Sequence, residues 1–116
     1  MVFIKDINDK RPGFKGLFTE ASIRRGDVIL ELDDRDITDN PTQTSIQIGD
    51  SLHIEDEIGK FINHSCEPNA VVDRTNLVIR AISDINSGDE ITFDYTKNES
   101  NILFPFVCKC CGKYIK

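Results

Sequence analysis

Short apolar runs separated by turn residues are the feature of this 116-residue chain that most limits how it can fold. Each run has the length of one β-strand, and Gly, Asn, Asp and Pro punctuate the intervals. The expected strands cover residues 2–5, 16–19, 28–32, 44–48, 52–55, 71–72, 77–82 and 91–95, with hairpins at 49–51 and 74–76. The pattern therefore predicts a single, mainly β domain of barrel-like or clipped architecture.

Helical patterning is weak. Ile58, Phe61 and Ile62 stand at i, i+3 and i+4, which is enough for one or two turns, and residues 98–104 precede Pro105 as another candidate turn. Long crossover helices are missing from the pattern, so a doubly wound α/β fold is not expected. The chain also has no Gly-rich strand-to-helix turn of the kind that such a fold uses to bind a nucleotide.

Charge limits the partners. With 14 Lys and Arg against 20 Asp and Glu, the net charge of −6 argues against binding to a nucleic-acid backbone. An acidic surface suits a basic, Lys-containing peptide, although solubility alone explains it as well. The longest apolar stretch, Ile102–Cys108, is interrupted by Pro105 and is too short for a bilayer. Without a secretion signal, we expect a cytoplasmic or other intracellular location and no membrane contact.

Three segments combine residues of chemical interest. Gly13–Phe18 has two glycines where backbone can approach a ligand closely. Phe61–Ala70 places a polar cluster with His64 after an apolar turn, and Gly88–Tyr95 is a turn followed by a strand. Taken singly, these are an ordinary turn, a surface loop and a strand with packing aromatics.

Taken together, the three segments closely resemble the SET-domain protein-lysine methyltransferases in their combination, order and spacing. Gly16-Leu17-Phe18, the Asn-His-Ser-Cys-x-Pro-Asn string at 63–69 and the Gly-Asp-Glu-Ile-Thr-Phe-Asp-Tyr string at 88–95 match the first, third and fourth family motifs. Arg24–Ile29 resembles the segment after the first motif, and the resemblance runs from about residue 12 to about residue 111. It implies a SET domain over residues 1–106, with small curved sheets and a knot-like C-terminal threading, and a short post-SET-like tail over 107–116.

The same resemblance implies S-adenosylmethionine-dependent methylation of a lysine side chain. Such a transfer needs a neutral amine, and an apolar channel lowers the lysine pKa from its usual value of about 10.4 by desolvation. By resemblance, Tyr95 is the catalytic residue, and Phe93, lacking a tyrosine hydroxyl, leaves room for higher methylation states. The implied donor-binding residues are Lys15, Gly16, Leu17, Asn63, His64 and Tyr95, and the implied substrate-channel residues are Phe93, Ile46 and Phe106.

The cysteines fit a family zinc site only in part. Cys66 and the pair Cys108 and Cys110 match three ligands of the four-cysteine site that many members carry. The position expected for the fourth ligand is Ile115, and Cys111 follows Cys110 directly instead. A compressed zinc site made by these four cysteines and a metal-free tail both remain open.

The resemblance also suggests partners. The substrate, a histone or another basic protein, would lie as an added strand in a groove with residues 44–48 as one wall. Small members of this kind sometimes act as homodimers. Two other classes remain open, a non-catalytic peptide-binding module with the same fold and a small structural zinc module.

Overall fold

Short β-strands are the main regular structure of the protein, as the spacing of its apolar runs predicts. The computed structural model describes residues 2–7, 15–32, 37–39, 45–49 and 52–98, together with the backbone of 106–107 and 114–115. The strands are β1 (Val2–Asp6), β2 (Lys15–Thr19), β3 (Val28–Glu31), β4 (Ile37–Thr38), β5 (Ile46–Gly49), β6 (Leu52–Ile54), β7 (Asn63–His64), β8 (Ala70–Asp73), β9 (Val78–Ala81), β10 (Glu90–Phe93), β11 (Phe106–Val107) and β12 (Tyr114–Ile115). The described residues also include the 3-10 helix η2 (Gly59–Phe61) and the helix α1 (Tyr95–Asn98).

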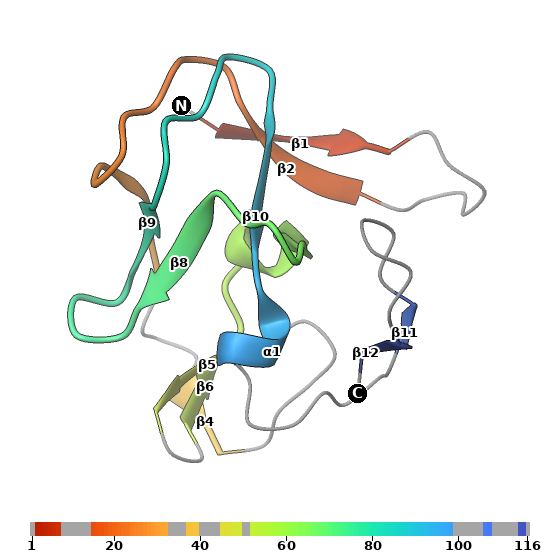
Figure 1. Cartoon of the computed structure of the whole chain (residues 1–116). Helices are drawn as coiled ribbons and strands as arrows, with labels where there is room; N and C mark the ends of the chain where they lie inside the picture. The colour runs from red at the N-terminus through yellow and green to blue at the C-terminus, as the bar shows by residue number, and fades with distance from the viewer. Residues whose placement is uncertain are drawn as a thin grey trace.

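A four-stranded sheet in the order β1-β2-β10-β7 joins segments that are far apart in the sequence. The first two residues of β10 pair antiparallel with β2, and its last two residues pair parallel with β7. Figure 1 shows β10 running through the centre of the molecule beside β2. Gly16-Leu17 and Asn63-His64 therefore lie on opposite sides of one strand.

Two three-stranded sheets flank this arrangement, in the orders β3-β9-β8 and β4-β6-β5. The β8–β9 and β5–β6 hairpins lie where the sequence predicts them. β11 and β12 form a further antiparallel pair. Strand formation thus follows the local apolar pattern, whereas the order of strands within each sheet depends on contacts between distant segments.

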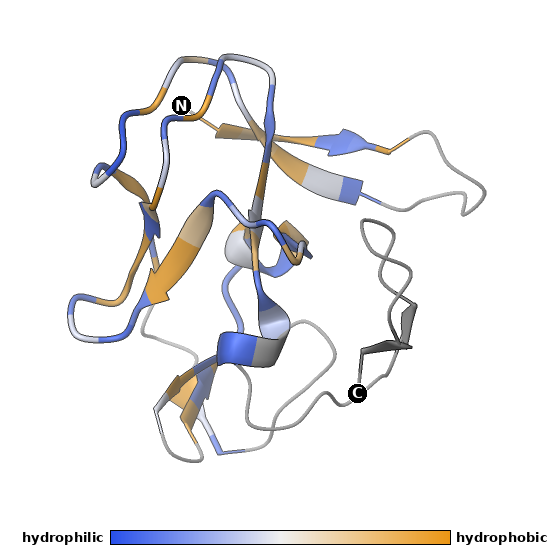
Figure 2. Cartoon of the chain, viewed as in Figure 1, coloured by the Kyte–Doolittle hydropathy of each residue, from blue (hydrophilic) through white to orange (hydrophobic). Residues whose placement is uncertain are grey.

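The core lies where the inward faces of the sheets meet. In β8 the buried Val72 follows the exposed Val71, and in β10 the buried Ile91 and Phe93 alternate with half-buried residues, as the two-residue period of a strand requires. Figure 2 shows β8 as strongly hydrophobic and the β8–β9 turn as mostly hydrophilic. The main buried cluster is Leu17, Leu32, Ile46, Ile54, Ile62, Ala70, Val72, Ile79, Ile91 and Phe93. Among the described residues, no helix has the length and apolar character that a membrane crossing requires.

One predicted strand boundary is wrong. The sequence predicts a strand from Ile91 to Tyr95, but β10 ends at Phe93 and Tyr95 begins α1. The Asp94 carbonyl accepts hydrogen bonds from the backbone N–H groups of Lys97 (3.1 Å) and Asn98 (3.3 Å), so the chain turns helical directly after β10. The predicted turn over 98–104 and the knot-like threading lie outside the described residues, apart from the end of α1.

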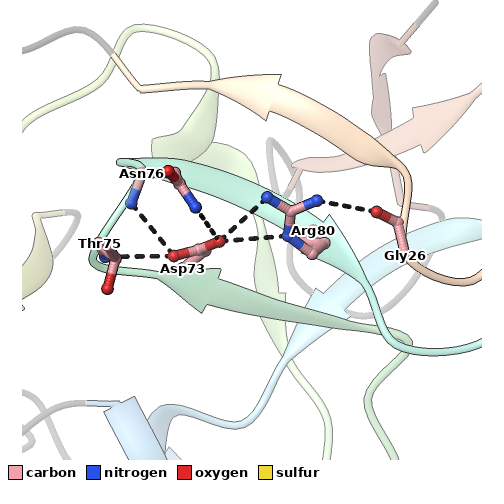
Figure 3. Close-up of polar contacts among 5 residues, drawn as sticks. All are labelled: Gly26, Asp73, Thr75, Asn76 and Arg80. Carbon is pink, nitrogen blue, oxygen red and sulfur yellow. Dashed lines mark hydrogen bonds and ion pairs between the residues drawn. The ribbon is translucent and has the colours of Figure 1, made fainter.

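A carboxylate organises the β8–β9 turn (Figure 3). Asp73 Oδ1 accepts hydrogen bonds from the backbone N–H groups of Thr75 (3.1 Å) and Asn76 (3.2 Å). Asp73 Oδ2 accepts from Asn76 Nδ2 (2.9 Å) and Arg80 Nη2 (3.1 Å), and Arg80 Nη1 donates to the Gly26 carbonyl (2.9 Å). The hydrogen bonds from Asn76, with a smaller contribution from Arg80, hold the pKa of Asp73 below its usual value.

Replacing Asp73 with Asn is expected to lower the midpoint of thermal unfolding at pH 7 by roughly 2–4 °C, because the turn loses charge-assisted hydrogen bonds at an accessible site. The folded-state pKa of Asp73 is depressed, so its carboxylate stabilises the fold above the unfolded-state pKa and stops doing so as pH falls through the folded-state pKa. Thermal unfolding followed by circular dichroism should show the two proteins converging in acid. The control is Asp39→Asn, and a difference that persists in acid would contradict the assigned role.

Candidate active site

The side chain of Asn63, on the edge strand β7, contacts both inner strands of the central sheet. Its Nδ2 atom donates hydrogen bonds to the Lys15 carbonyl on β2 (3.0 Å) and to Glu90 Oε2 on β10 (2.8 Å). Because β10 lies between β7 and β2 in the sheet, the amide on β7 contacts its neighbour β10 and also reaches β2 beyond it. The first and third sequence motifs therefore meet through one amide group.

Gly16 makes this meeting possible. A Cβ atom at position 16 would lie 2.6 Å from Glu90 Oε2, 2.9 Å from Ile7 Cδ1 and 3.2 Å from Asn63 Nδ2. A side chain there would require the ends of the Glu90 and Ile7 side chains to shift, and it would crowd the Asn63 amide. The neighbouring Leu17 is fully buried and belongs to the core, so only its backbone can face a ligand.

Tyr95 is held at its backbone by His64 of β7 and at its hydroxyl by Ile62, the residue that precedes β7. Its backbone N–H donates to His64 Nδ1 (3.0 Å), and its hydroxyl donates to the Ile62 carbonyl (2.5 Å). Its ring meets those of Phe93 and His64 at tilted angles, with centroids 5.0 Å and 5.4 Å away. The helical turn after β10 thus brings Tyr95 against Asn63-His64, as the resemblance implies.

His64 is a buried imidazole in its neutral form. Its side chain is 2% exposed, and burial lowers its pKa although Asp94 Oδ1, 3.6 Å from Nδ1, acts in the opposite direction. Because Nδ1 accepts a hydrogen bond from Tyr95, the hydrogen-bond pattern assigns the proton of the neutral ring to Nε2. Nε2 lies 3.5 Å from Cys66 Sγ, so the ring links Tyr95 to the cysteine of the third motif.

Two residues of this site were not singled out from the sequence, Glu90 and Asn69. Asn69 Nδ2 donates to the Glu90 carbonyl (2.8 Å), and Asn69 Oδ1 accepts from the Thr92 N–H (3.0 Å), so its side chain replaces a strand partner along β10. Asn69 belongs to the third motif, and Glu90 is the first residue of β10, in which Ile91 and Phe93 are buried. The motif strings contain both residues, but only the strand pairing reveals their contacts.

The structure describes the remaining candidate residues to different extents. Phe93 ends β10 and is 4% exposed, and Ile46 on β5 is 2% exposed, so both belong to the buried cluster against which Tyr95 packs. Of Phe106 the structure describes only the backbone, in β11. Among the described residues there is no group of three or more His, Cys, Asp or Glu able to hold a metal ion. Three of the predicted zinc ligands, Cys108, Cys110 and Cys111, lie outside the described residues.

The described contacts of this site offer hydrogen bonding and desolvation to a ligand. The Tyr95 oxygen lies beside the Ile62 carbonyl, which places two acceptor atoms next to aromatic rings. Such an arrangement suits an amine, because its N–H groups need acceptors and its charge is disfavoured by apolar surroundings.

Comparison with known proteins gives the family. The SET domain model matches residues 15–96. The variant-silencing SET domain-containing protein of Plasmodium falciparum is 31% identical over 92% of this chain, and the chain covers 5% of that protein. The H3 lysine-4 specific histone-lysine N-methyltransferase of Schizosaccharomyces pombe is 30% identical over 80% of this chain and 13% of its own length. The chain belongs to the SET domain family, and it spans less than half the length of these relatives.

Solved structures confirm the fold. The chain of ctPRC2 in an autoinhibited conformation bound to S-adenosylmethionine matches 99% of this chain with a TM-score of 0.67 at 16% identity, over 19% of its own length. KRYPTONITE, solved with mCHH DNA, an H3(1–15) peptide and SAH, matches 92% of this chain with a TM-score of 0.66 at 20% identity, over 27% of its length. The predicted fold, a mainly β SET domain, is therefore confirmed.

Replacing Gly16 with Ala is expected to separate Asn63 from Glu90 and to lower the free energy of unfolding by about 1–3 kcal/mol, the usual cost of overpacking. The side-chain amide resonance of Asn63 should shift in an NMR spectrum, and thermal unfolding should measure the loss of stability. Gly49→Ala is the matched control, because the nearest atom to a Cβ there is 3.8 Å away in ordinary contact. Equal effects of the two substitutions would contradict a special role for Gly16.

Proposed function

We propose that this protein transfers methyl groups from S-adenosylmethionine to the side-chain amine of lysine in a basic protein or peptide. The observation that carries the proposal is the convergence of Asn63, His64 and Tyr95 around β10, with the Tyr95 hydroxyl fixed on the Ile62 carbonyl. The names of its relatives support the same activity, since several are histone-lysine N-methyltransferases.

The donor would be held by Asn63, His64 and the backbone of residues 15–17. Nδ2 of Asn63 is already engaged by the Lys15 carbonyl and by Glu90, which leaves the amide oxygen to accept a hydrogen bond from a ligand. When bound, S-adenosylmethionine supplies an activated methyl group on a sulfonium. A zinc site made by Cys66, Cys108, Cys110 and Cys111 stays a prediction.

The acceptor amine would be prepared by its surroundings. Phe93 and Tyr95 exclude water from the approaching side chain, and the lost solvation favours the neutral, nucleophilic amine. The Tyr95 hydroxyl proton is directed to the Ile62 carbonyl, so the hydroxyl oxygen accepts an N–H of the amine and orients its lone pair. Positioning of this kind supplies about 7–11 kcal/mol in favourable cases, without a general base in the protein.

The substrate would enter beside β5. This strand lies at the edge of the β4-β6-β5 sheet, and an extended peptide can add to an edge strand through backbone hydrogen bonds. The net charge of −6 favours a basic peptide. Histone H3 is a reasonable first candidate, because the solved structure of KRYPTONITE contains an H3(1–15) peptide.

Incubation with labelled S-adenosylmethionine and a panel of histones and Lys-containing peptides, read by mass spectrometry, tests the activity. Replacing Tyr95 with Phe is expected to reduce turnover by about a hundredfold or more, because the amine loses its positioned acceptor, and to weaken donor binding much less, because Asn63, His64 and the backbone of residues 15–17 are unchanged. Ser83→Ala, which removes an exposed hydroxyl elsewhere, is the control. Donor binding without labelling of any substrate would instead favour a non-catalytic peptide-binding module.

The methylation state provides a further test. Phe93 is expected to allow di- and trimethylation, because its ring lies 5.0 Å from that of Tyr95 and carries no hydroxyl that would occupy space or hold water. Replacing Phe93 with Tyr should shift the products towards monomethyllysine, with the rate of the first transfer changed much less. Mass spectrometry of the product over several turnovers measures the distribution, and an unchanged distribution would refute the assignment.

A further inference from the structure

Glu90 is a half-buried carboxylate at the centre of the candidate donor site. Its Oε2 atom accepts a hydrogen bond from Asn63 Nδ2 (2.8 Å) and lies over Gly16, where a Cβ would come within 2.6 Å of it. Its backbone is held in place by the Asn69 side chain, and Glu90 has no cationic partner among the described residues. Partial burial of an ionised carboxylate without a counterion is unfavourable, which indicates that Glu90 has a functional role.

The Asn63 amide can point in two ways, and its neighbours decide which. Both atoms near Nδ2, the Lys15 carbonyl and the ionised Glu90 carboxylate, can only accept hydrogen bonds. If the amide were flipped, Oδ1 would face two acceptors, and two hydrogen bonds would be lost. The ionised carboxylate therefore keeps Nδ2 turned towards β2 and β10 and leaves Oδ1 facing the other way.

We propose that Glu90 is a positioning residue of the donor site, whose ionised carboxylate locks the Asn63 amide so that Oδ1 is presented to a hydrogen-bond donor group of S-adenosylmethionine. This inference rests on the proposed function, and it adds a residue that does not itself contact the substrate amine. A protonated Glu90 can donate as well as accept, so it tolerates both orientations of the amide. Burial raises the pKa of Glu90, with the Asn63 hydrogen bond opposing that shift, so the lock loosens as pH falls through this raised pKa.

The other charged or titratable groups on the surrounding elements contact partners other than Glu90. On the β1–β2 pair, Lys15 Nζ bonds to Asp6 Oδ1 (2.6 Å), and Lys5 Nζ lies over the Phe18 ring at 4.9 Å. In the other elements, Lys60 Nζ lies over the Phe61 ring at 5.5 Å, His64 Nδ1 faces Tyr95, and an Asp89 carboxylate oxygen accepts from the Asn86 N–H. None of them forms an ion pair with Glu90 within the described part of the chain, so the side-chain amide of Asn63, which contacts the carboxylate, should report the protonation of Glu90.

A double-mutant cycle on donor affinity tests the proposal. The parent protein and the variants Glu90→Gln, Asn63→Ala and the double variant are compared by calorimetric titration with S-adenosylmethionine. Glu90→Gln should weaken binding by about fivefold, because a neutral amide replaces a charge-assisted acceptor and can itself flip. In the Asn63→Ala background the same substitution should have no further effect. Glu31→Gln, an exposed change in another sheet, is the control and should leave binding unchanged.

The outcomes separate the possibilities. Additive effects in the cycle would overturn the proposal and assign Glu90 a direct electrostatic effect on the donor, whereas equal affinity of parent and Glu90→Gln would show no role. If the parent protein binds no S-adenosylmethionine, the proposed function fails first, and this inference fails with it.

A second measurement needs no substitution and covers the case in which Glu90→Gln does not fold. The side-chain amide resonance of Asn63 in the parent protein, followed by NMR against pH, should change with a midpoint above that of an exposed glutamate. The ring resonances of His64 report its own titration separately. An Asn63 amide that does not respond to pH, or that follows only the His64 titration, would overturn the proposal.

Discussion

The pairing of β10 with β2 along one edge and with β7 along the other is the constraint on which the rest of the site depends. Only β10 lies between β2 and β7, so the side-chain amide of Asn63 on β7 reaches the Lys15 carbonyl on β2 as well as the Glu90 carboxylate on β10. The pairing also requires a substitute partner where β7 is too short, and the Asn69 side chain provides it. Directly after β10 the chain turns into α1, which brings Tyr95 back against His64.

Local pattern predicted the strands well because the alternation of apolar and polar residues is a local property. It failed at Tyr95, where the sequence continues the alternation but the Asp94 carbonyl starts a helical turn. The site residues Asn63, His64 and Tyr95 were predicted from motif resemblance, since nothing in their own neighbourhood specifies a ligand. Glu90 was missed because its importance arises from Gly16 and Asn63, which lie 74 and 27 positions away in sequence.

The electrostatics of the site contrast with those of the rest of the chain. The surface is acidic overall, and at the β8–β9 turn an accessible carboxylate is surrounded by hydrogen-bond donors that lower its pKa. At the centre of the molecule, burial is the main influence instead, and it lowers the pKa of His64 and raises that of Glu90.

The parallel pairing of β7 with β10 also has a consequence for how the protein reaches its native state. Thr92 opposite Asn63 closes a loop of nearly thirty residues, and Ile91 opposite Leu17 closes a much longer one. Contacts of such high sequence separation form slowly, because the entropy of closing the loop is lost before the contacts stabilise it. During synthesis on the ribosome the hairpins can form early, but no part of the site can assemble until β10 has emerged. The binding site therefore forms in one late step of folding. A chain whose synthesis stops before that step would expose the apolar core faces of its sheets to chaperones.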